Sequence, residues 1–353
     1  MNKYLSKKAR SITPYTAGEQ PEIKNIIKLN TNENPYPPSP EVLKSIQGEA
    51  GKLRLYPKTD GGVFRKAAAE YENVEVKNIF CANGSDELLA FAFLAFFDPD
   101  KAIKMLQVTY SFYPVWAELY NIPYALAPLN KDFSIDPASL YNSKGGVIFP
   151  NPNAPTGIAV SVSDIEDIVK NNTGYIVIVD EAYSAFGAKT AVILTEKYEN
   201  LLIVKTLSKS HALAGLRCAY AVGSPDLIEG LERIKDSFNS YPLDMLAQAG
   251  AAAALTDKAY YAQTSEKIIN TRENTKTALK ALGFDVTDSV SNFLFITHPK
   301  IAAKILMQSL REKGIVVRHF DKPMIGNHLR VTVGTDEQMD LFLKETAAIL
   351  AGR

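Results

Sequence analysis

Three short apolar runs rich in β-branched residues lie in the middle of the chain, at residues 146–149, 175–179 and 201–204. Runs of this kind are typical of strands that are buried on both faces of a parallel sheet. Helical or loop stretches separate them, as crossover connections between parallel strands require. The pattern predicts an α/β fold with a mostly parallel central sheet flanked by helices.

Polar residues follow each of these runs directly. Asn151 and Asn153 come after the first run, Asp180 after the second, and Lys209 shortly after the third. In open α/β sheets ligands bind at the carboxyl ends of the strands. We therefore expect the chemistry of this protein at these positions.

The 353 residues suggest about two domains. A helical stretch from about residue 243 to 282 begins a second pattern, in which three predicted strands alternate with two helices. Thr335, with Gln338 three residues later, forms a capping box that opens the last helix. We expect an extended N-terminal arm (residues 1–35), a large domain (36–243) and a smaller C-terminal α+β domain (244–353).

Composition excludes several classes of function. Lys plus Arg and Asp plus Glu number 39 each, so the basic surplus that nucleic-acid binding needs is missing. No apolar run is long enough to cross a membrane, and the N-terminus does not resemble a signal peptide. The two cysteines and four histidines have no metal-ligand spacing, so we expect a cytoplasmic protein without a metal.

A phosphate-binding helix start is predicted at residues 83–87, ahead of an apolar helical run. Gly84, Ser85 and Asp86 lie there, with Ser85 or Asp86 placed as N-cap. The free N–H groups and positive dipole end of a helix N-terminus attract a phosphate dianion. An ordinary capped helix would have the same sequence, so the segment is informative only together with others.

Lys209 follows the third apolar run, and Arg217 lies eight residues further on. A lysine at a strand end can form a Schiff base with an aldehyde cofactor and later carry a proton. Ser208 and Arg217 could then bind the phosphate of that cofactor. If that cofactor is pyridoxal phosphate, Asp180 and Tyr183, after the second run, could contact the nitrogen and the hydroxyl of its pyridine ring.

The ordered set NGSDE, NPNAPTG, DEAY, TLSK and GLR resembles the fold-type I pyridoxal-phosphate aminotransferases. The flanking segments ITPY, KLNTNENP, LYP and LRVTVG are similar to those of the histidinol-phosphate aminotransferases in particular. The match extends over essentially the whole chain. It implies transamination between L-glutamate and imidazole acetol phosphate, giving histidinol phosphate in histidine biosynthesis, by a ping-pong mechanism.

The resemblance implies a role for each matching residue. Lys209 would be the Schiff-base lysine and proton shuttle, Asp180 the partner of the pyridine nitrogen, and Tyr183 the partner of the ring hydroxyl. Tyr110 would stack on the cofactor ring. The residues around the cofactor phosphate would be Gly84, Ser85, Asp86, Ser208 and Arg217.

The resemblance also implies a homodimer with shared active sites, because Tyr56 would reach the cofactor phosphate of the neighbouring subunit. Arg330 would hold the carboxylate of glutamate and the phosphate of the second substrate. Tyr15 and Arg318 are further candidates for that pocket. One departure from the family stands in the loop at residues 151–157, where many relatives carry asparagine at the position of Ala154 and Asn153 is the expected substitute.

Other functions share parts of this pattern. Threonine-phosphate decarboxylase and aromatic aminotransferases have the same fold and most of the motifs, although the LNTNENPYPPSP segment is closer to the histidinol-phosphate pattern. A pyridoxal-phosphate-binding transcription regulator would carry a basic helix-turn-helix domain ahead of the fold. Only a short arm precedes the fold here, which disfavours that alternative.

Overall fold

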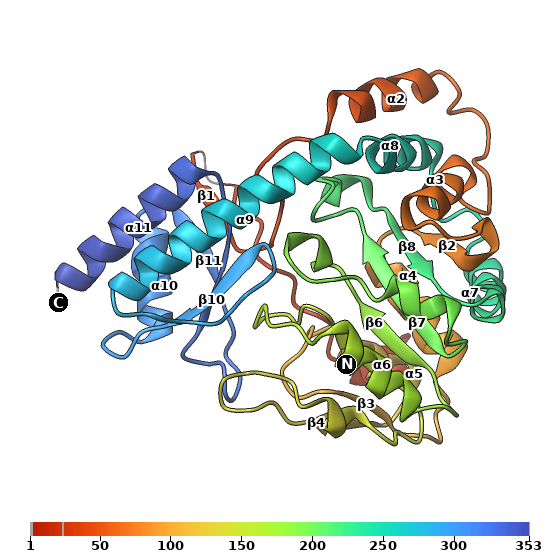
Figure 1. Ribbon diagram of the computed structural model, residues 1–353, viewed down its shortest axis with the longest axis horizontal. Coiled ribbons are helices and arrows are strands. Elements are labelled where there is room, and N and C mark those ends of the chain that lie inside the picture. Colours follow the sequence, from red (N-terminus) through yellow and green to blue (C-terminus); the bar gives the residue numbers. More distant parts are fainter. Residues whose placement is uncertain (1–2, 23–24, 353) are drawn as a thin grey trace.

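The computed structural model describes residues 3–22 and 25–352. Its larger part is built on a seven-stranded sheet, which Figure 1 shows beside the smaller part. The strand order is β2-β8-β7-β6-β5-β3-β4, and all neighbours are parallel except those that pair with β8. The strands are β2 (Ile79–Ala82), β3 (Ile103–Leu106), β4 (Tyr124–Ala127), β5 (Val147–Pro150), β6 (Val177–Asp180), β7 (Leu201–Thr206) and β8 (Ala219–Val222).

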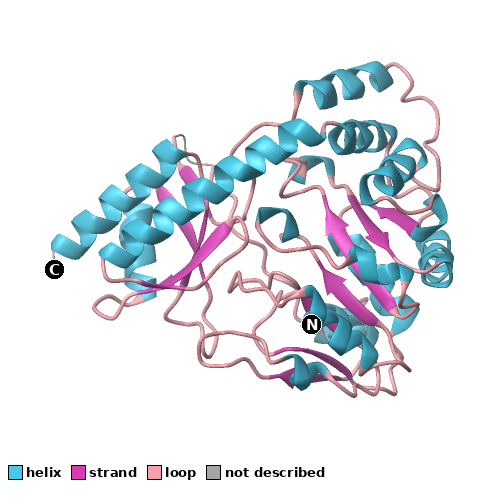
Figure 2. Ribbon diagram, in the orientation of Figure 1, coloured by secondary structure: helices cyan, strands magenta, loops and turns pink. Residues whose placement is uncertain are grey.

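Helices cover both faces of this sheet (Figure 2). They are α3 (Gly62–Glu72), α4 (Ser85–Phe96), α5 (Tyr113–Tyr120), α6 (Val162–Lys170), α7 (Pro225–Phe238) and α8 (Met245–Thr256), and α2 (Pro40–Ala50) packs on α8. Alternate residues of each central strand enter opposite cores: Val177 packs in one and Ile178 in the other. Both faces of the sheet are therefore buried. The predicted α/β class, with a mostly parallel sheet flanked by helices, is confirmed.

A second, five-stranded sheet has the order β1-β11-β12-β10-β9. Its strands are β1 (Ile27–Leu29), β9 (Asp285–Val286), β10 (Phe293–Thr297), β11 (Ile315–His319) and β12 (Leu329–Thr332). The helices α9 (Lys258–Ala281), α10 (Ala303–Glu312) and α11 (Asp336–Ala351) pack with it. Strand β1 comes from the N-terminal arm and lies parallel to β11, so the arm is tied to the C-terminal sheet.

Short elements complete the described chain. They are the helix α1 (Lys7–Ser11) and the 3-10 turns η1 (Val76–Asn78), η2 (Pro137–Leu140), η3 (Ser184–Phe186), η4 (Val192–Glu196) and η5 (Ala214–Leu216). Within residues 3–22 and 25–352, no helix combines the length and the apolar character that a bilayer crossing needs.

Three local predictions differ from the structure. The single helix expected from about residue 243 to 282 is two helices, because Asp257 ends α8 and its side chain accepts the backbone N–H of Tyr260 at the start of α9. Helix α8 packs against α2 and α3, beside the large sheet, although the sequence places it in the second domain.

The N-cap of α4 is Gly84 and makes no side-chain bond, so neither Ser85 nor Asp86 caps this helix. The capping box of Thr335 and Gln338 is confirmed.

Candidate active site

A cavity of about 460 Å³ lies at the carboxyl ends of β5, β6 and β7. The arm and the five-stranded sheet form its opposite wall, through Tyr15 and Arg330 among others. The sequence-predicted site residues that line it are Tyr15, Ser85, Asp86, Tyr110, Asp180, Tyr183, Ser208, Lys209, Arg217, Arg318 and Arg330. Residues separated by up to 315 positions in the sequence thus meet in one pocket.

Lys209 presents its amine to the interior of this cavity. Its Nζ donates to the backbone oxygen of Thr31 at 3.1 Å and lies 5.9 Å from the centre of the Tyr183 ring. Burial, together with the nearby positive charge of Arg330, lowers the pKa of Lys209 to about 8. A neutral amine, the form that attacks an aldehyde, is therefore populated near neutral pH.

Asp180 ends strand β6 and is 5% exposed. Its carboxylate accepts the Tyr113 hydroxyl at 2.9 Å and the backbone N–H of Ala182 at 3.1 Å. Burial raises the pKa of Asp180 to about 6, and these two hydrogen bonds oppose the rise. A cation placed beside this carboxylate, such as a protonated ring nitrogen, would keep it ionised.

Tyr183 is held by residues that are remote in sequence. Its hydroxyl accepts the side-chain amide of Asn32 at 3.0 Å, and its ring meets the edge of Phe293 with centroids 5.1 Å apart. Burial raises the pKa of Tyr183, so the hydroxyl remains protonated and can donate a hydrogen bond. Asn32 is fixed in turn, because Thr332 accepts its backbone N–H at 2.9 Å.

The start of α4 and Arg217 form one end of the cavity. Gly84 has φ +86°, and a Cβ at this position would lie 2.5 Å from Nη2 of Arg217, so only glycine allows this approach. Arg217 pairs with Asp86 at 3.2 Å, and Asp86 also accepts the Tyr110 hydroxyl at 2.9 Å. Helix N–H groups, a guanidinium and a hydroxyl at Ser208 together fit a phosphate dianion.

Arg330 lies on β12 at the opposite wall. Its Nη2 donates to the backbone oxygen of Asn30 at 3.0 Å, and its guanidinium lies over the rings of Phe293 and Phe320 at 5.3 and 5.5 Å. Its Nε is buried and finds no hydrogen-bond partner among the described residues. An unpaired donor on a cation at a cavity wall fits an anionic ligand group.

Tyr15 and Arg318 belong to the same wall. The ring of Tyr15 stacks on Phe112, with centroids 4.5 Å apart and 23° between the planes. The guanidinium of Arg318 donates to the backbone oxygens of Thr16 and Ala17 at 3.3 and 3.4 Å. These contacts hold the arm across the cavity.

Three predicted residues are not part of the cavity lining: Gly84, Asn153 and Tyr56. Gly84 acts through its lack of a side chain. The side-chain amide of Asn153 donates to the backbone oxygen of Val108 at 3.0 Å and to Oγ1 of Thr156 at 3.2 Å, so this geometry does not support the prediction that Asn153 substitutes for the family asparagine at position 154. Tyr56 is 81% exposed and packs on Tyr241.

The sequence pattern assigned no role to several residues of the site, among them Thr31, Asn32 and Thr206 in the cavity lining and Tyr113 behind Asp180. The first two lie in the LNTNENP segment, which carried the family resemblance but not a position in space. Tyr113 reaches Asp180 from 67 residues away. Only a signal that relates distant positions could have found these contacts.

Comparison with known proteins agrees with this architecture. Residues 24–345 match the family described as aminotransferase class I and II, and the chain belongs to this family. More specifically, it is 48% identical to the histidinol-phosphate aminotransferase 1 of Oceanobacillus iheyensis, with 99% of each chain covered. It is 49% identical to the histidinol-phosphate aminotransferase of Clostridium acetobutylicum, with 99% of this chain and 100% of the relative covered.

Solved structures show the same fold. The histidinol-phosphate aminotransferase of Sinorhizobium meliloti, in complex with pyridoxal-5'-phosphate, superposes with a TM-score of 0.88 at 21% identity, covering 99% of both chains. A putative histidinol-phosphate aminotransferase from Erwinia carotovora has a TM-score of 0.86 at 24% identity, covering 95% of this chain and 99% of that one.

Proposed function

We propose that this protein is a pyridoxal-phosphate-dependent aminotransferase that interconverts histidinol phosphate and imidazole acetol phosphate, with L-glutamate and 2-oxoglutarate as the second pair. The observation that carries this proposal is the identity of 48 to 50%, over 95 to 99% of the chain, to relatives named histidinol-phosphate aminotransferase. The reaction is a step of histidine biosynthesis, and we place it in the cytoplasm.

Pyridoxal phosphate, when bound, supplies an electron sink that stabilises negative charge on the substrate carbon next to nitrogen. The chain offers a separate group for each part of the cofactor. The N-terminus of α4 with Ser208 and Arg217 would hold the phosphate, Asp180 the ring nitrogen, and Tyr183 the ring hydroxyl. Tyr110 lines the same wall and would lie against the ring.

Lys209 has two tasks in this scheme. Its amine would hold the cofactor through the aldehyde, and the same amine, when free, would accept the proton of the substrate carbon and donate it again within the site. A pKa of about 8 suits both tasks, because such an amine can accept and release protons near neutral pH.

Arg330 would hold the anionic end of both substrates, the side-chain or α-carboxylate of glutamate in one half-reaction and the phosphate of histidinol phosphate in the other. A guanidinium forms paired hydrogen bonds with either group. Tyr15 and Arg318 line the same wall and support binding there.

We also propose that the active unit is a homodimer with shared sites. Tyr56 is exposed and lies outside the cavity of its own chain, and the neighbouring Leu53 and Leu55 are exposed as well. A second copy covering this segment would bury these apolar side chains and bring Tyr56 to the partner's cofactor phosphate.

The dimer proposal can be tested by mixing two inactive variants, Lys209→Ala and Tyr56→Ala. In a mixed dimer with shared sites, one site has both residues intact, so part of the activity returns. No recovery in demonstrated heterodimers would contradict sharing.

The substrate proposal is tested with a panel of amino acceptors and glutamate as donor. Imidazole acetol phosphate should give a higher kcat/KM than phenylpyruvate. The reverse order would favour an aromatic aminotransferase, and release of carbon dioxide from threonine phosphate would favour a decarboxylase.

A further inference from the structure

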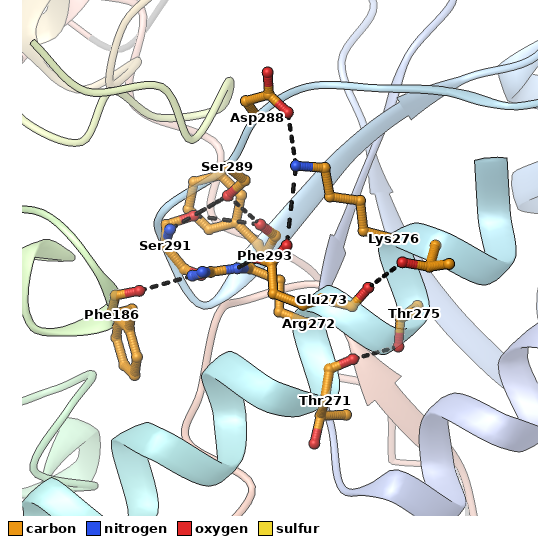
Figure 3. Close-up of polar contacts among 11 residues, drawn as sticks. Phe186, Thr271, Arg272, Glu273, Thr275, Lys276, Asp288, Ser289, Ser291 and Phe293 are labelled. Carbon is orange, nitrogen blue, oxygen red and sulfur yellow. Dashed lines mark hydrogen bonds and ion pairs between the residues drawn. The ribbon is translucent and has the colours of Figure 1, made fainter.

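A buried arginine outside the cavity joins the turn that follows Tyr183 to a second segment, which packs against Tyr183 and Arg330 (Figure 3). Arg272 lies on α9 and is 4% exposed. Its Nη1 donates to the backbone oxygen of Phe186 at 2.7 Å and to that of Ser291 at 2.8 Å. One nitrogen therefore binds two carbonyl groups that lie 105 residues apart in the sequence.

The first of these carbonyls belongs to the turn that follows Tyr183. Phe186 ends η3, and Tyr183 is the residue that immediately precedes this turn. A bond that fixes the end of η3 therefore limits how far the turn, and Tyr183 at its start, can move.

The second carbonyl belongs to the approach to β10. Ser291 is followed by Asn292, whose amide donates to the backbone oxygen of Asn32 at 3.0 Å, and by Phe293. The ring of Phe293 meets Tyr183 edge-on and lies beneath the guanidinium of Arg330. The two hydrogen bonds of Arg272 thus hold the turn that follows Tyr183 and the segment whose Phe293 packs against the Tyr183 ring.

From these contacts we infer that Arg272 is a positioning residue, which sets the Tyr183 hydroxyl in the cavity by holding η3 against the segment before β10. The inference rests on the proposed function, because it assigns Tyr183 to the ring hydroxyl of pyridoxal phosphate. Arg272 itself touches neither substrate nor cofactor.

The ion pair of Arg272 with Glu273 does not account for its burial. Glu273 is its neighbour in the chain, and the Glu273 side chain is 49% exposed, whereas the arginine side chain is 5% exposed. Buried carbonyl groups are seldom left without a donor, so Phe186 and Ser291 need this guanidinium in place. Lys276, one turn further along α9, pairs with Asp288 at 2.6 Å and with Glu273 at 4.0 Å, and it makes no hydrogen bond to either carbonyl.

The test is the pH midpoint of the visible absorbance of the cofactor-loaded enzyme, measured without substrate. A hydroxyl that donates to the ionised ring oxygen of the cofactor favours loss of the proton from the nitrogen that joins Lys209 to the cofactor. Removing this hydroxyl in Tyr183→Phe therefore raises the pH midpoint of the absorbance change. Arg272→Met should raise the midpoint in the same direction by roughly half a pH unit or more. Lys276→Met, the matched control, should leave it unchanged.

The double variant separates positioning from general destabilisation. If Arg272 acts through Tyr183, Arg272→Met should add nothing to the midpoint of Tyr183→Phe, whereas independent effects would be additive and would overturn the inference. Arg272→Lys keeps a cationic donor and should return part of the shift.

If Arg272→Met fails to fold, Arg272→Lys decides alone. A lysine reaches the carbonyls with one flexible ammonium in place of a planar fork, so its midpoint should lie above the wild-type value, and an unchanged midpoint refutes the inference. The proposed substrate does not enter this measurement. Failure of the acceptor panel would therefore leave the positioning role standing, and an unchanged midpoint would leave the substrate assignment standing.

Discussion

The two walls of the cavity are built in different ways. On one wall Asp180 ends β6 and Lys209 follows the neighbouring parallel strand β7, so their proximity results from the topology of a single sheet. On the other wall Arg330 is tied to Asn30, and Asn32 to Thr332, by hydrogen bonds that span 300 residues. The second wall exists only once the arm has joined the five-stranded sheet.

The two walls also differ in the kind of charged group that they present to the cavity. Burial brings the pKa of Lys209 down to about 8 and the pKa of Asp180 up to about 6, so both groups titrate near neutral pH. Arg330 and Arg318 on the other wall are guanidinium groups, whose planar forks suit carboxylate and phosphate groups through paired hydrogen bonds. We expect the strand-end wall to control the chemical step and the arginine wall to control the capture of anions.

The largest effect should follow the loss of the amine on the strand-end wall. Lys209→Ala should lower turnover by about 10⁴-fold, the upper range for removing a general acid-base group. Steady-state assays give this value, and borohydride reduction followed by peptide mapping should find the cofactor on Lys209 in the parent protein. Label on a different lysine would remove Lys209 from this role, and Lys197→Ala, an exposed control, should retain full activity.

Asp180→Asn should have the next largest effect, about 10²- to 10³-fold on kcat, as for the loss of one preorganised electrostatic contact. The amide preserves size but cannot stabilise a protonated ring nitrogen. Cofactor binding, followed by visible absorbance, should persist, because the phosphate contacts are intact. Near-normal turnover in this variant would show that the carboxylate is dispensable.

The same contrast explains how much could be predicted from sequence. The runs before Asp180 and Lys209 are continuous, apolar and rich in β-branched residues, as in strands buried on both faces, so β6 and β7 and the residues at their ends were recognisable locally. Arg330 was found only through the family resemblance, because nothing within its own strand distinguishes it from a structural arginine.

The failures have local physical causes. Gly84 replaced the expected N-caps, since the close approach of Arg217 requires a residue without Cβ at φ +86°. The break between α8 and α9 was missed because residues that favour helices, such as alanine and leucine, lie on both sides of Asp257. Asn32 and Arg272 gained their roles from partners far away in the chain, which no window of sequence contains.

On the arginine wall, Arg330→Lys should reduce the rate of each half-reaction by about 10- to 100-fold, the value of one or two hydrogen bonds to a charged group. Lysine keeps the positive charge but loses the paired geometry. Single-turnover measurements with glutamate and with histidinol phosphate test the two half-reactions separately. A loss confined to one substrate would show that the wall has two anchors, and a loss with neither would exclude Arg330.

The smallest effect concerns the electrostatic interaction between Arg330 and Lys209, which lie on opposite walls. Only the neutral amine of Lys209 attacks an aldehyde, so the initial rate of pyridoxal phosphate uptake by the cofactor-free protein should rise with pH and level off above about 8. Because the positive charge of Arg330 helps to lower this pKa, Arg330→Met should move the midpoint to higher pH by less than about one unit. Peptide mapping after borohydride reduction at each pH restricts the measurement to Lys209. A midpoint near 10.5 in the parent protein would contradict the effect of burial, and a midpoint that stays near 8 in Arg330→Met would show that the two walls do not interact electrostatically.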